Sequence, residues 1–434
     1  MISTQILLGL YGKVKGKKVV DVERPSMFNP SITVVIPCRN ESKRLPYALA
    51  SLARQTYKID RVIIIDDGSP DDTFEIGKLM RELLNLNIEI IRNGHISIGK
   101  TPSIRKAIGM CTTDKIFVLD ADTILEDDYI EKMIAPHLDN RVACSYGIVR
   151  PLSGDIKKNI YNQTLETLLH EEIRQKQELS SAFVHKFSKK VINNYKENLK
   201  FSNILKYYLY EYPVIKYREA IYADQYFIRE SQKRIFNTTL FPVGCGVLYD
   251  REKLKAVFDK YKTTLGDNLT TSEDIFVGFE FCNAGMINYQ VRNAYMWTAE
   301  PKITRLPFQL VLWNSSFIQS AFYFKDMSKR LIGNKEKKPI GLTILPPIVE
   351  KVSYPLVLII MGVIAYKWAI ITIGIEFLTF FGIYYFVTPK KERKGLASSL
   401  IIAEPIRLLA IPIDFYVLYN FCVDLIKGNR NWRK

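Results

Sequence analysis

Three acidic motifs, each beside an apolar segment, are the residues of this chain whose types and spacing best fit a chemical role. Asp66 and Asp67 follow one apolar segment, Asp120 and Asp122 follow a second, and Asp274 precedes a third. Carboxylates bind hard cations such as Mg²⁺ and Mn²⁺, which keep coordination places for water and phosphate. A carboxylate shielded from water can also take the proton of a hydroxyl group. Together these motifs predict a site that binds a diphosphate through a metal ion and activates a hydroxyl group.

The pair Asp120 and Asp122 is the candidate metal site. It comes directly after the apolar residues 116–119, so a strand there would present both carboxylates at its end. We interpret Asp122 and Asp120 as ligands of Mn²⁺ or Mg²⁺, and Asp120 also as a contact of the bound nucleotide. The alternative is that the two aspartates cap a helix that begins near Glu126.

The other nucleotide contacts are predicted after two further apolar segments and before a helix. A carboxylate of Asp66 or Asp67 can accept a hydrogen bond from the imide nitrogen of uracil, and Asn40 and Glu41 add a polar edge after the first segment. Lys100 precedes a predicted helix and could balance the negative charge of a diphosphate. The alternatives are a strand-to-helix turn for the acidic pair and a solvated surface position for the lysine.

Asp274 is the predicted general base, and the alternative is that it caps the N-terminus of a helix. We interpret six further residues as contacts of the acceptor that bears the hydroxyl group: Gly244, Cys245, Gly246, Glu273, Gln309 and Trp313. The glycines let an acceptor approach the backbone closely, and a plain bend is the alternative. The indole of Trp313 offers a platform for a sugar or for the lipid interface.

The elements that must position these motifs alternate between strand and helix. The apolar pattern predicts strands at residues 32–36, 61–65, 88–91 and 115–119, and helices at residues 45–55, 73–84 and 103–110. Such alternation is typical of an α/β fold with a mostly parallel sheet covered by helices. Ligands of such sheets bind beyond the carboxyl ends of the strands, so we expect the motifs at Asn40, Asp66 and Asp120 to border one crevice.

A charged, tyrosine-rich segment interrupts this pattern at residues 154–234. We predict a helical insertion there, with helices at residues 165–178 and 202–210. Its tyrosines would pack against the domain or the lipid interface, and an acceptor-binding lid is the alternative.

The C-terminal part of the 434-residue chain is predicted to lie in a membrane. Residues 354–387 are apolar except for Lys367 and Glu376, a stretch too long for one crossing of a hydrocarbon layer of ~30 Å at ~1.5 Å per residue. Two helices with a turn near Lys367 fit better. Residues 396–426 contain prolines and charges, which favours a broken, re-entrant or interfacial pair of helices over a third ordinary span.

The net charge of +16 is concentrated in basic clusters beside the apolar segments, at residues 335–338, 390–394 and 430–434. Basic flanks mark the cytoplasmic side, so we expect a multi-pass protein of the cell membrane with a cytoplasmic catalytic domain. The charge follows the membrane segments and no nucleic-acid-binding motif is recognisable, so no nucleic acid is expected as a partner. The six cysteines form no Cys-x-x-Cys pair, which argues against zinc.

These features divide the chain into three predicted parts. Residues 1–28 form a membrane-surface segment or a tail, residues 29–325 the catalytic domain, and residues 340–427 the membrane region.

Taken together, the motifs resemble those of the membrane-bound inverting glycosyltransferases of family 2, a group with cellulose, chitin and hyaluronan synthases and ceramide glucosyltransferases. The resemblance covers residues 31–320, with residues 154–234 poorly matched. It implies a nucleotide-diphospho-sugar transferase domain of the GT-A type, a UDP-sugar as donor, a metal bound by Asp-x-Asp, and a Glu-Asp motif whose aspartate, here Asp274, is the catalytic base. Asn40 with Glu41 and Asp66 with Asp67 are similar to the nucleotide-contacting motifs of these enzymes, and Lys100 to their Gly-Lys stretch.

One motif departs from the pattern of the family. Members commonly carry Gln-x-x-Arg-Trp before the membrane helices, whereas Leu312 here occupies the arginine position between Gln309 and Trp313. Arg305 or Lys302 could substitute for that arginine. The acceptor therefore stays open between a growing glycan and a lipid or lipid-linked molecule in the membrane. A catalytically inactive nucleotide-sugar sensor or scaffold tethered to the membrane is the alternative from another class.

Overall fold

The structure is a computed structural model and describes residues 4–16, 23–152, 207–261, 272–329, 340–388, 393 and 395–427. The helix predicted at residues 165–178 and the basic clusters at residues 335–338 and 430–434 lie outside the described residues, as does most of the cluster at residues 390–394.

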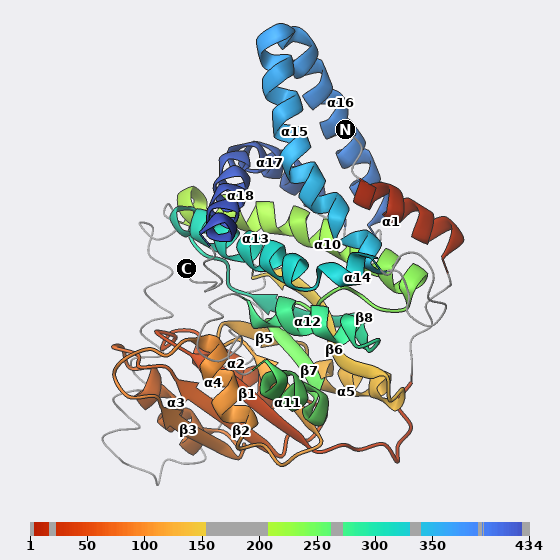
Figure 1. Ribbon diagram of the computed structural model, residues 1–434. Coiled ribbons are helices and arrows are strands. Elements are labelled where there is room, and N and C mark those ends of the chain that lie inside the picture. The colour runs from red at the N-terminus through yellow and green to blue at the C-terminus, as the bar shows by residue number, and fades with distance from the viewer. Residues whose placement is uncertain are drawn as a thin grey trace.

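An eight-stranded mixed sheet forms the lower part of the molecule (Figure 1). Its strands, in spatial order, are β3 (Ile88–Arg92), β2 (Arg61–Asp66), β1 (Ile32–Cys38), β4 (Lys115–Leu119), β7 (Gly246–Asp250), β6 (Val142–Pro151), β8 (Ile287–Thr298) and β5 (Thr123–Leu125). The pairs β3/β2, β2/β1, β1/β4 and β6/β8 are parallel, and β7 runs antiparallel to both of its neighbours. The sheet is therefore mostly parallel, as predicted.

Helices cover both faces of this sheet, which explains why its central strands β1, β2 and β4 are nearly continuous apolar segments. All seven residues of β1 are buried. Val34 packs in a core with α2 (Leu45–Ala53), α3 (Thr73–Leu83) and α5 (Tyr129–Ile134), which is followed by the 3₁₀ turn η1 (Ala135–Leu138). Val35 packs on the opposite face with α4 (Lys100–Ile108), α11 (Arg251–Lys260) and α12 (Glu273–Asn283).

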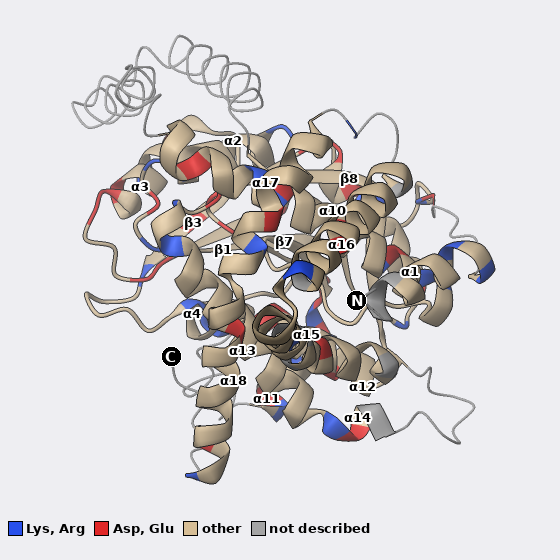
Figure 2. Ribbon diagram, turned by 90° about the horizontal axis from the view of Figure 1, so that it is seen from above, with Lys and Arg blue, Asp and Glu red and all other residues tan. Residues whose placement is uncertain are grey.

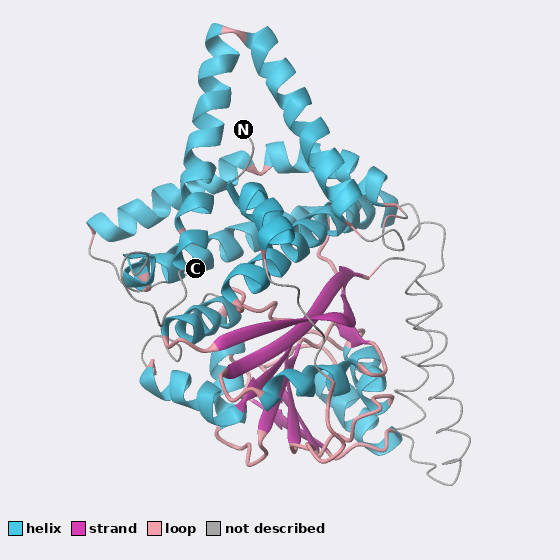
Figure 3. Ribbon diagram, turned by 90° about the vertical axis from the view of Figure 1, so that its right-hand side faces the viewer, coloured by secondary structure: helices cyan, strands magenta, loops and turns pink. Residues whose placement is uncertain are grey.

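A layer of helices lies between the sheet and the helical hairpin of residues 345–387 (Figure 3). Its main members are α10 (Tyr212–Phe236), which follows the short π-helical turn η3 (Tyr207–Glu211), and α13 (Leu306–Tyr323), which follows the 3₁₀ turn η5 (Ile303–Arg305). The predicted insertion ends at residue 234, whereas α10 continues to Phe236 and packs on β6 and β8. Its C-terminal half is therefore an integral part of the domain.

The N-terminal helix α1 (Thr4–Lys15) packs along α10 through glycines. A Cβ atom on Gly9 would lie 2.2 Å from the ring of Phe227, and one on Gly12 would lie 2.9 Å from Ser231 Cβ. Small residues thus let the two helices approach closely. Lys13 and Lys15 lie in the last turn of α1, and they colour the C-terminal end of this helix blue in Figure 2.

The helices α15 (Leu345–Ile364) and α16 (Tyr366–Val387) are both long and apolar enough to cross a membrane. They form a hairpin that stands clear of the other layers in Figures 1 and 3, with the break at Ala365, two residues before the predicted turn. The next pair, α17 (Leu396–Leu409) and α18 (Ile411–Ile426), is bent by 42° at Ala410. Two short helices, α14 (Lys325–Lys329) and η6 (Ile340–Thr343), precede the hairpin.

Candidate active site

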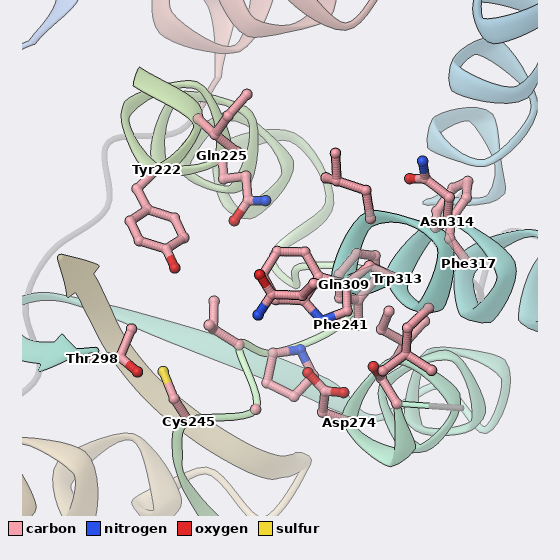
Figure 4. Close-up of a pocket in the computed structure, with 18 of the residues that line it drawn as sticks. Tyr222, Gln225, Phe241, Cys245, Asp274, Thr298, Gln309, Trp313, Asn314 and Phe317 are labelled. Atoms are coloured by element: carbon pink, nitrogen blue, oxygen red, sulfur yellow. The ribbon is translucent and has the colours of Figure 1, made fainter. Parts of the chain in front are cut away.

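A cavity of about 740 Å³ lies where the sheet, α10, α12 and α13 meet. Its lower wall carries Asp120, Asp122 and Asp274, and its upper wall includes residues of α15, α17 and α18. Figure 4 shows Cys245 and Thr298 at one end of the cavity and Asn314 with Phe317 at the other. The predicted catalytic motifs thus share one cavity with helices of the predicted membrane region.

Asp120 and Asp122 lie in a tight turn between two strands. β4 ends at Leu119, β5 begins at Thr123, and α5 begins only at Tyr129, so neither aspartate caps a helix. The backbone N–H of Asp120 donates to Cys245 O at 3.0 Å, and Thr298 Oγ1 donates to Asp122 Oδ1 at 3.4 Å. Burial, together with the negative charge of Asp120, raises the pKa of Asp122 to about 6. The turn therefore concentrates negative charge at the end of β4.

Lys100 joins this turn to the candidate base. Its Nζ lies 2.7 Å from Asp120 Oδ1 and 3.2 Å from Glu273 Oε1. The lysine is the first residue of α4, three residues earlier than the predicted start of this helix, and it follows Gly99, whose φ of 99° favours glycine. Lys100 thus places one positive charge between the two acidic motifs.

Asp274 lies in the first turn of α12, beside the backbone of Gly244. A Cβ atom on Gly244 would lie only 2.7 Å from Asp274 Oδ2, so a side chain at this position would collide with the carboxyl group. The start of α12 is also fixed to α13, because Ser272 N donates to Ser316 Oγ at 3.0 Å. Burial raises the pKa of Asp274 to about 7, and the carboxylate of Glu273 adds to the shift.

Four of the predicted nucleotide contacts do not line this cavity. Asp66 is fully buried, and its Oδ2 lies 3.1 Å from Arg92 Nε. Asp67 is 5% exposed and accepts hydrogen bonds from Asn93 Nδ2, Ser97 Oγ, Ile98 N and Gly99 N. Although burial alone would raise its pKa, these bonds lower the pKa of Asp67 below its ordinary value. Asp67 thereby shapes the loop that leads to Lys100.

Asn40 and Glu41 form a neighbouring loop after β1. Asn40 has a left-handed backbone conformation and its N–H donates to Ser69 Oγ at 3.0 Å, while Glu41 N donates to Thr73 Oγ1 at 2.8 Å. Burial raises the pKa of Glu41 to about 7, although Arg44 opposes the shift. The negative charges of Asp122 and Asp120 add to the shift. β1 and β4 are parallel neighbours, so the loop after β1 and the acidic turn after β4 lie at the same edge of the sheet.

Of the predicted acceptor contacts, the structure brings five to the cavity: Gly244, Cys245, Glu273, Gln309 and Trp313. Gly246 is different because it is the first residue of β7 and is buried in the sheet. A Cβ atom there would lie 2.7 Å from Met296 Sδ, so this glycine serves the packing of the sheet.

The profile of the family described as "Glycosyl transferase family 2" matches residues 33–258, which is more than half of the chain. The chain belongs to this family. An N-acetylglucosaminyltransferase of Bradyrhizobium elkanii is 31% identical over 132 residues, covering 29% of this chain and 70% of the relative.

Two other family 2 relatives match shorter segments. A 4,4'-diaponeurosporenoate glycosyltransferase of Staphylococcus haemolyticus is 35% identical over 109 residues, which cover 25% of this chain and 28% of the relative. A poly-beta-1,6-N-acetyl-D-glucosamine synthase of Staphylococcus aureus is 32% identical over 97 residues, which cover 22% of this chain and 23% of the relative. The chain thus spans about a quarter of the length of these two relatives.

A mannosyltransferase from Pyrobaculum calidifontis, solved in complex with GDP-Man and Mn²⁺, has a similar fold. The two structures superpose with a TM-score of 0.57 at 15% sequence identity, covering 93% of this chain and 94% of the other. This likeness, together with the mixed sheet and the family match, confirms the predicted fold of the GT-A type.

The sequence-based interpretation of this family 2 chain missed a buried cluster on α10. Arg218 is 1% exposed, and its Nε lies 3.1 Å from Glu300 Oε2. Its Nη2 donates to Gln309, and its guanidinium stacks over the ring of Trp313 at 4.3 Å. Tyr222 OH donates to the other oxygen of Glu300 at 2.7 Å. The cluster thus joins α10, the end of β8 and α13 in one wall of the cavity.

Leu312 stands where the family motif has an arginine, and the structure shows that Arg218 is the arginine that contacts Gln309 and Trp313. Lys302 and Arg305, which could substitute for the missing arginine by sequence, are both exposed and do not line the cavity. The guanidinium that contacts Gln309 and Trp313 instead comes from a helix about ninety residues earlier in the chain. The signal available in the sequence was the spacing of polar residues along α10, but this segment matched the family poorly.

The residues at the end of β4 fit a divalent cation by the chemistry of their donors. Asp120 and Asp122 offer carboxylate oxygens, which Mg²⁺ and Mn²⁺ prefer, and these ions bind with one or two protein carboxylates when a substrate phosphate supplies further ligands. Among the described residues, no group of three or more His, Cys, Asp and Glu side chains is arranged to hold a metal by itself.

Proposed function

We propose that this protein is a metal-dependent, inverting glycosyltransferase of the membrane that moves a sugar from a nucleotide-diphosphate donor to an acceptor hydroxyl. The donor in this proposal is a UDP-sugar, and the acceptor is a glycan or a lipid-linked molecule at the cytoplasmic face of the cell membrane. Family membership and the cavity described above support the reaction class.

The observation that carries the proposal is the bridge made by Lys100. One ammonium group lies within 3.2 Å of both Asp120 and Glu273, so the candidate metal turn and the first turn of α12 are held together. Asp274 follows Glu273 directly and faces the same cavity. The proposed metal turn and the proposed base therefore border the same part of the cavity.

In the proposed mechanism, Asp274 takes the proton of the acceptor hydroxyl while its oxygen attacks the anomeric carbon of the donor. The bond between that carbon and the diphosphate oxygen breaks, and the nucleoside diphosphate leaves with the bonding electrons. A single displacement of this kind inverts the anomeric configuration. The raised pKa of Asp274 suits this role, because a base with a pKa near the working pH accepts a proton readily.

Asp122 and Asp120 are the residues that would hold the metal, and Lys100, whose Nζ lies 2.7 Å from Asp120 Oδ1, would add positive charge near the diphosphate. A bound Mn²⁺ or Mg²⁺ supplies positive charge to the leaving diphosphate. The Pyrobaculum calidifontis mannosyltransferase was solved with Mn²⁺, which supports a divalent metal in this fold. We propose Asn40, Glu41, Asp66 and Asp67 for the nucleoside side of the donor site, with the two aspartates acting through the loops they anchor.

The test is a transfer assay with the full chain in native lipid, supplied with Mn²⁺ or Mg²⁺ and a panel of radiolabelled UDP- and GDP-sugars. We expect label to move from one UDP-sugar to a product of inverted anomeric configuration, and chelation of the metal to stop the transfer. Binding of nucleotide without transfer or hydrolysis of any donor would contradict the proposal and favour a sensor or scaffold. Transfer from GDP-sugars alone would show that the donor is a GDP-sugar and not a UDP-sugar.

A further inference from the structure

The hairpin of α15 and α16 indicates at which level of the molecule the lipid boundary lies. Its two helices have 20 and 22 residues, which at ~1.5 Å per residue give lengths close to a hydrocarbon layer of ~30 Å. A hairpin with so little spare length must use all of both helices to cross the layer. The lipid boundary on the side of the sheet therefore falls near Leu345, the first residue of α15, and Val387, the last residue of α16.

Two polar contacts join this end of the hairpin to the helices that cover the sheet. Lys351, in the second turn of α15, has its Nζ 2.6 Å from Asp414 Oδ1 of α18, and Asn314 Nδ2 of α13 donates to the same oxygen at 2.6 Å. Tyr384, in the last turn of α16, donates to Asp224 of α10. Because each contact lies within two turns of an end of the hairpin, α10, α13 and α18 all approach the lipid boundary.

The helix α18 turns one face to these helices and the opposite face away from them. Asp414 and Val417, which is 2% exposed, lie on the inward face. Tyr416, Tyr419 and Ile426 are exposed, Tyr419 to 68%. At about 3.6 residues per turn, the two sets point to opposite sides of the helix. Tyrosine is enriched where a bilayer meets water, so the outward face has the composition of a helix at a membrane surface.

The N-terminal helix α1 has the same two-sided arrangement. Gly9 and Gly12 pack against α10. Leu7, Tyr11 and Val14 are exposed on the opposite side, Val14 to 75%, and their spacing by four and three residues is the repeat of one helix face. In Figure 1 α1 lies above α10, on the side from which the hairpin rises, and it contacts α15. Its apolar outward face therefore lies beside the first candidate span.

Basic residues lie at one end of each of these two helices. Lys13 and Lys15 are exposed in the last turn of α1, and Lys427, also exposed, follows the last residue of α18. A lysine at a membrane surface packs its alkyl chain along apolar groups and reaches the lipid phosphates with its ammonium group. The charge at these helix ends is therefore complementary to a bilayer that contains anionic lipids.

The length and the contacts of α18 also argue against a third crossing of the membrane. Its 16 residues span ~24 Å, less than the hydrocarbon layer, and its first turn is joined to α13 and α15 through Asp414. The preceding helix α17 buries Leu396 and Leu400 in one apolar cluster with Val214 of α10. Both helices of the bent pair thus pack on the helices at the base of the hairpin.

We propose that α1 and α18, which lie on different sides of the hairpin in Figures 1 and 2, lie flat in the surface of the lipid bilayer. Their outward faces contact the head groups and the adjoining acyl carbons, and the bent pair α17 and α18 does not form a third span. This inference does not depend on the proposed function. It places one end of the cavity next to the lipid surface, because Asp414 on the inward face of α18 lines the cavity.

The experiment measures the depth of spin labels on the full chain, reconstituted in vesicles of phosphatidylcholine and phosphatidylglycerol. Cys422→Ser first removes the exposed native thiol, and Tyr416→Cys or Ile426→Cys then carries the label. Collisions with oxygen, which concentrates in lipid, and with a nickel chelate, which stays in water, report the depth of each label. The two labelled positions are ~15 Å apart along the helix. We expect both labels at the same depth, near the head groups.

The same measurement on α1 uses Leu7→Cys and Val14→Cys. These positions are ~10 Å apart along the helix, and their labels should also lie at one depth near the head groups. Arg81→Cys, on the exposed surface of α3, is the control for full contact with water, and Ile375→Cys, in the middle of α16, is the control for the lipid interior. The temperature of thermal unfolding reports whether each labelled variant is folded.

Three outcomes would overturn the proposal. A difference of about 15 Å in depth between the labels at Tyr416 and Ile426 would show that α18 crosses the membrane. Labels as accessible to the nickel chelate as the label at Arg81 would show that the outward faces contact water. Labels protected from both oxygen and the chelate would show that protein, such as a second copy of the chain, covers these faces.

Discussion

The two halves of the cavity are built in different ways. The half at the sheet uses short motifs that follow or precede regular elements: the turn at Asp120 and Asp122 after β4, and Asp274 at the start of α12. The half toward the membrane is assembled from side chains far apart in the sequence, such as Arg218 and Trp313. The first half carries the motifs that resemble those of the family, and the second carries the contacts that the sequence motifs did not predict.

This difference indicates where the specificity of the protein resides. Strand ends and helix starts place carboxylates in fixed positions, so the same motifs suit many sugar donors. Packing between α10, α13 and the membrane helices determines the shape and charge of the remaining space. If the comparison is right, changes in the sheet half should reduce transfer to any acceptor, whereas changes in the membrane half should act mainly on the acceptor.

The largest effect is expected for Asp274→Asn. The amide cannot take the acceptor proton, so the rate of transfer should fall by about a thousandfold or more. Binding of the donor nucleotide should stay close to that of the wild type, because the role proposed for Asp274 is on the acceptor hydroxyl. Single-turnover transfer and nucleotide binding by calorimetry measure the two properties. Asp259→Asn, on the exposed side of α11, serves as the control, and parallel losses of binding and transfer would refute the role of Asp274 as base.

The next effect is expected for Asp122→Ala. Removal of this proposed ligand should weaken metal-dependent nucleotide binding by at least about a hundredfold, the upper range for loss of groups that only support a metal ligand. The measurement is nucleotide affinity across a Mn²⁺ titration. Asp127→Ala is a matched control, because Asp127 is a half-exposed carboxylate nearby that pairs with Arg54. Metal dependence that survives in Asp122→Ala would show that the metal binds elsewhere.

A smaller effect, confined to the acceptor, is expected for Arg218→Met. The variant keeps an apolar side chain over Trp313 but loses the bonds to Gln309 and Glu300, so the KM for the acceptor should rise about tenfold. The KM for the donor should change little. The variant would also leave the buried Glu300 without its cationic partner, which should lower the temperature of unfolding. Adding Glu300→Gln should restore part of that stability. A rise confined to the KM for the donor would contradict the assignment of Arg218 to the acceptor side of the cavity.

The smallest effect concerns pH. A carboxyl group with a pKa raised to about 7 is protonated below that pH, so the base is lost as the pH falls and recovered as it rises. Transfer should be close to its plateau above pH 8 and about fourfold slower half a pH unit below 7. The acid limb of the pH profile of kcat measures this dependence. The residual transfer by Asp274→Asn should show no such limb. A kcat that stays flat down to pH 5 would contradict the raised pKa.

The sequence by itself determined the first four strands of the sheet and the motifs at their ends, but not the strands β5 to β8. The strand at residues 115–119 was predicted with the bounds it has, and β1, β2 and β3 differ from the prediction only at their carboxyl ends. The reason is physical: strands buried on both faces are continuous apolar segments, and polar residues mark their ends. Parallel neighbours then bring Asn40, Asp66 and Asp120 to one edge of the sheet, but of the three only Asp120 lines the cavity, so the predicted single crevice is met in part.

Only the tertiary structure decided which of these side chains face the cavity and which support it. Asp67 has its carboxylate occupied by donors from residues 93–99, and Gly246 packs inside the sheet, although both looked like ligand contacts in the sequence. The contact between Arg218 and Trp313 could not be predicted from the sequence either. Periodicity predicts which face of a helix is polar but not what that face meets, since its partner is set by packing between distant segments.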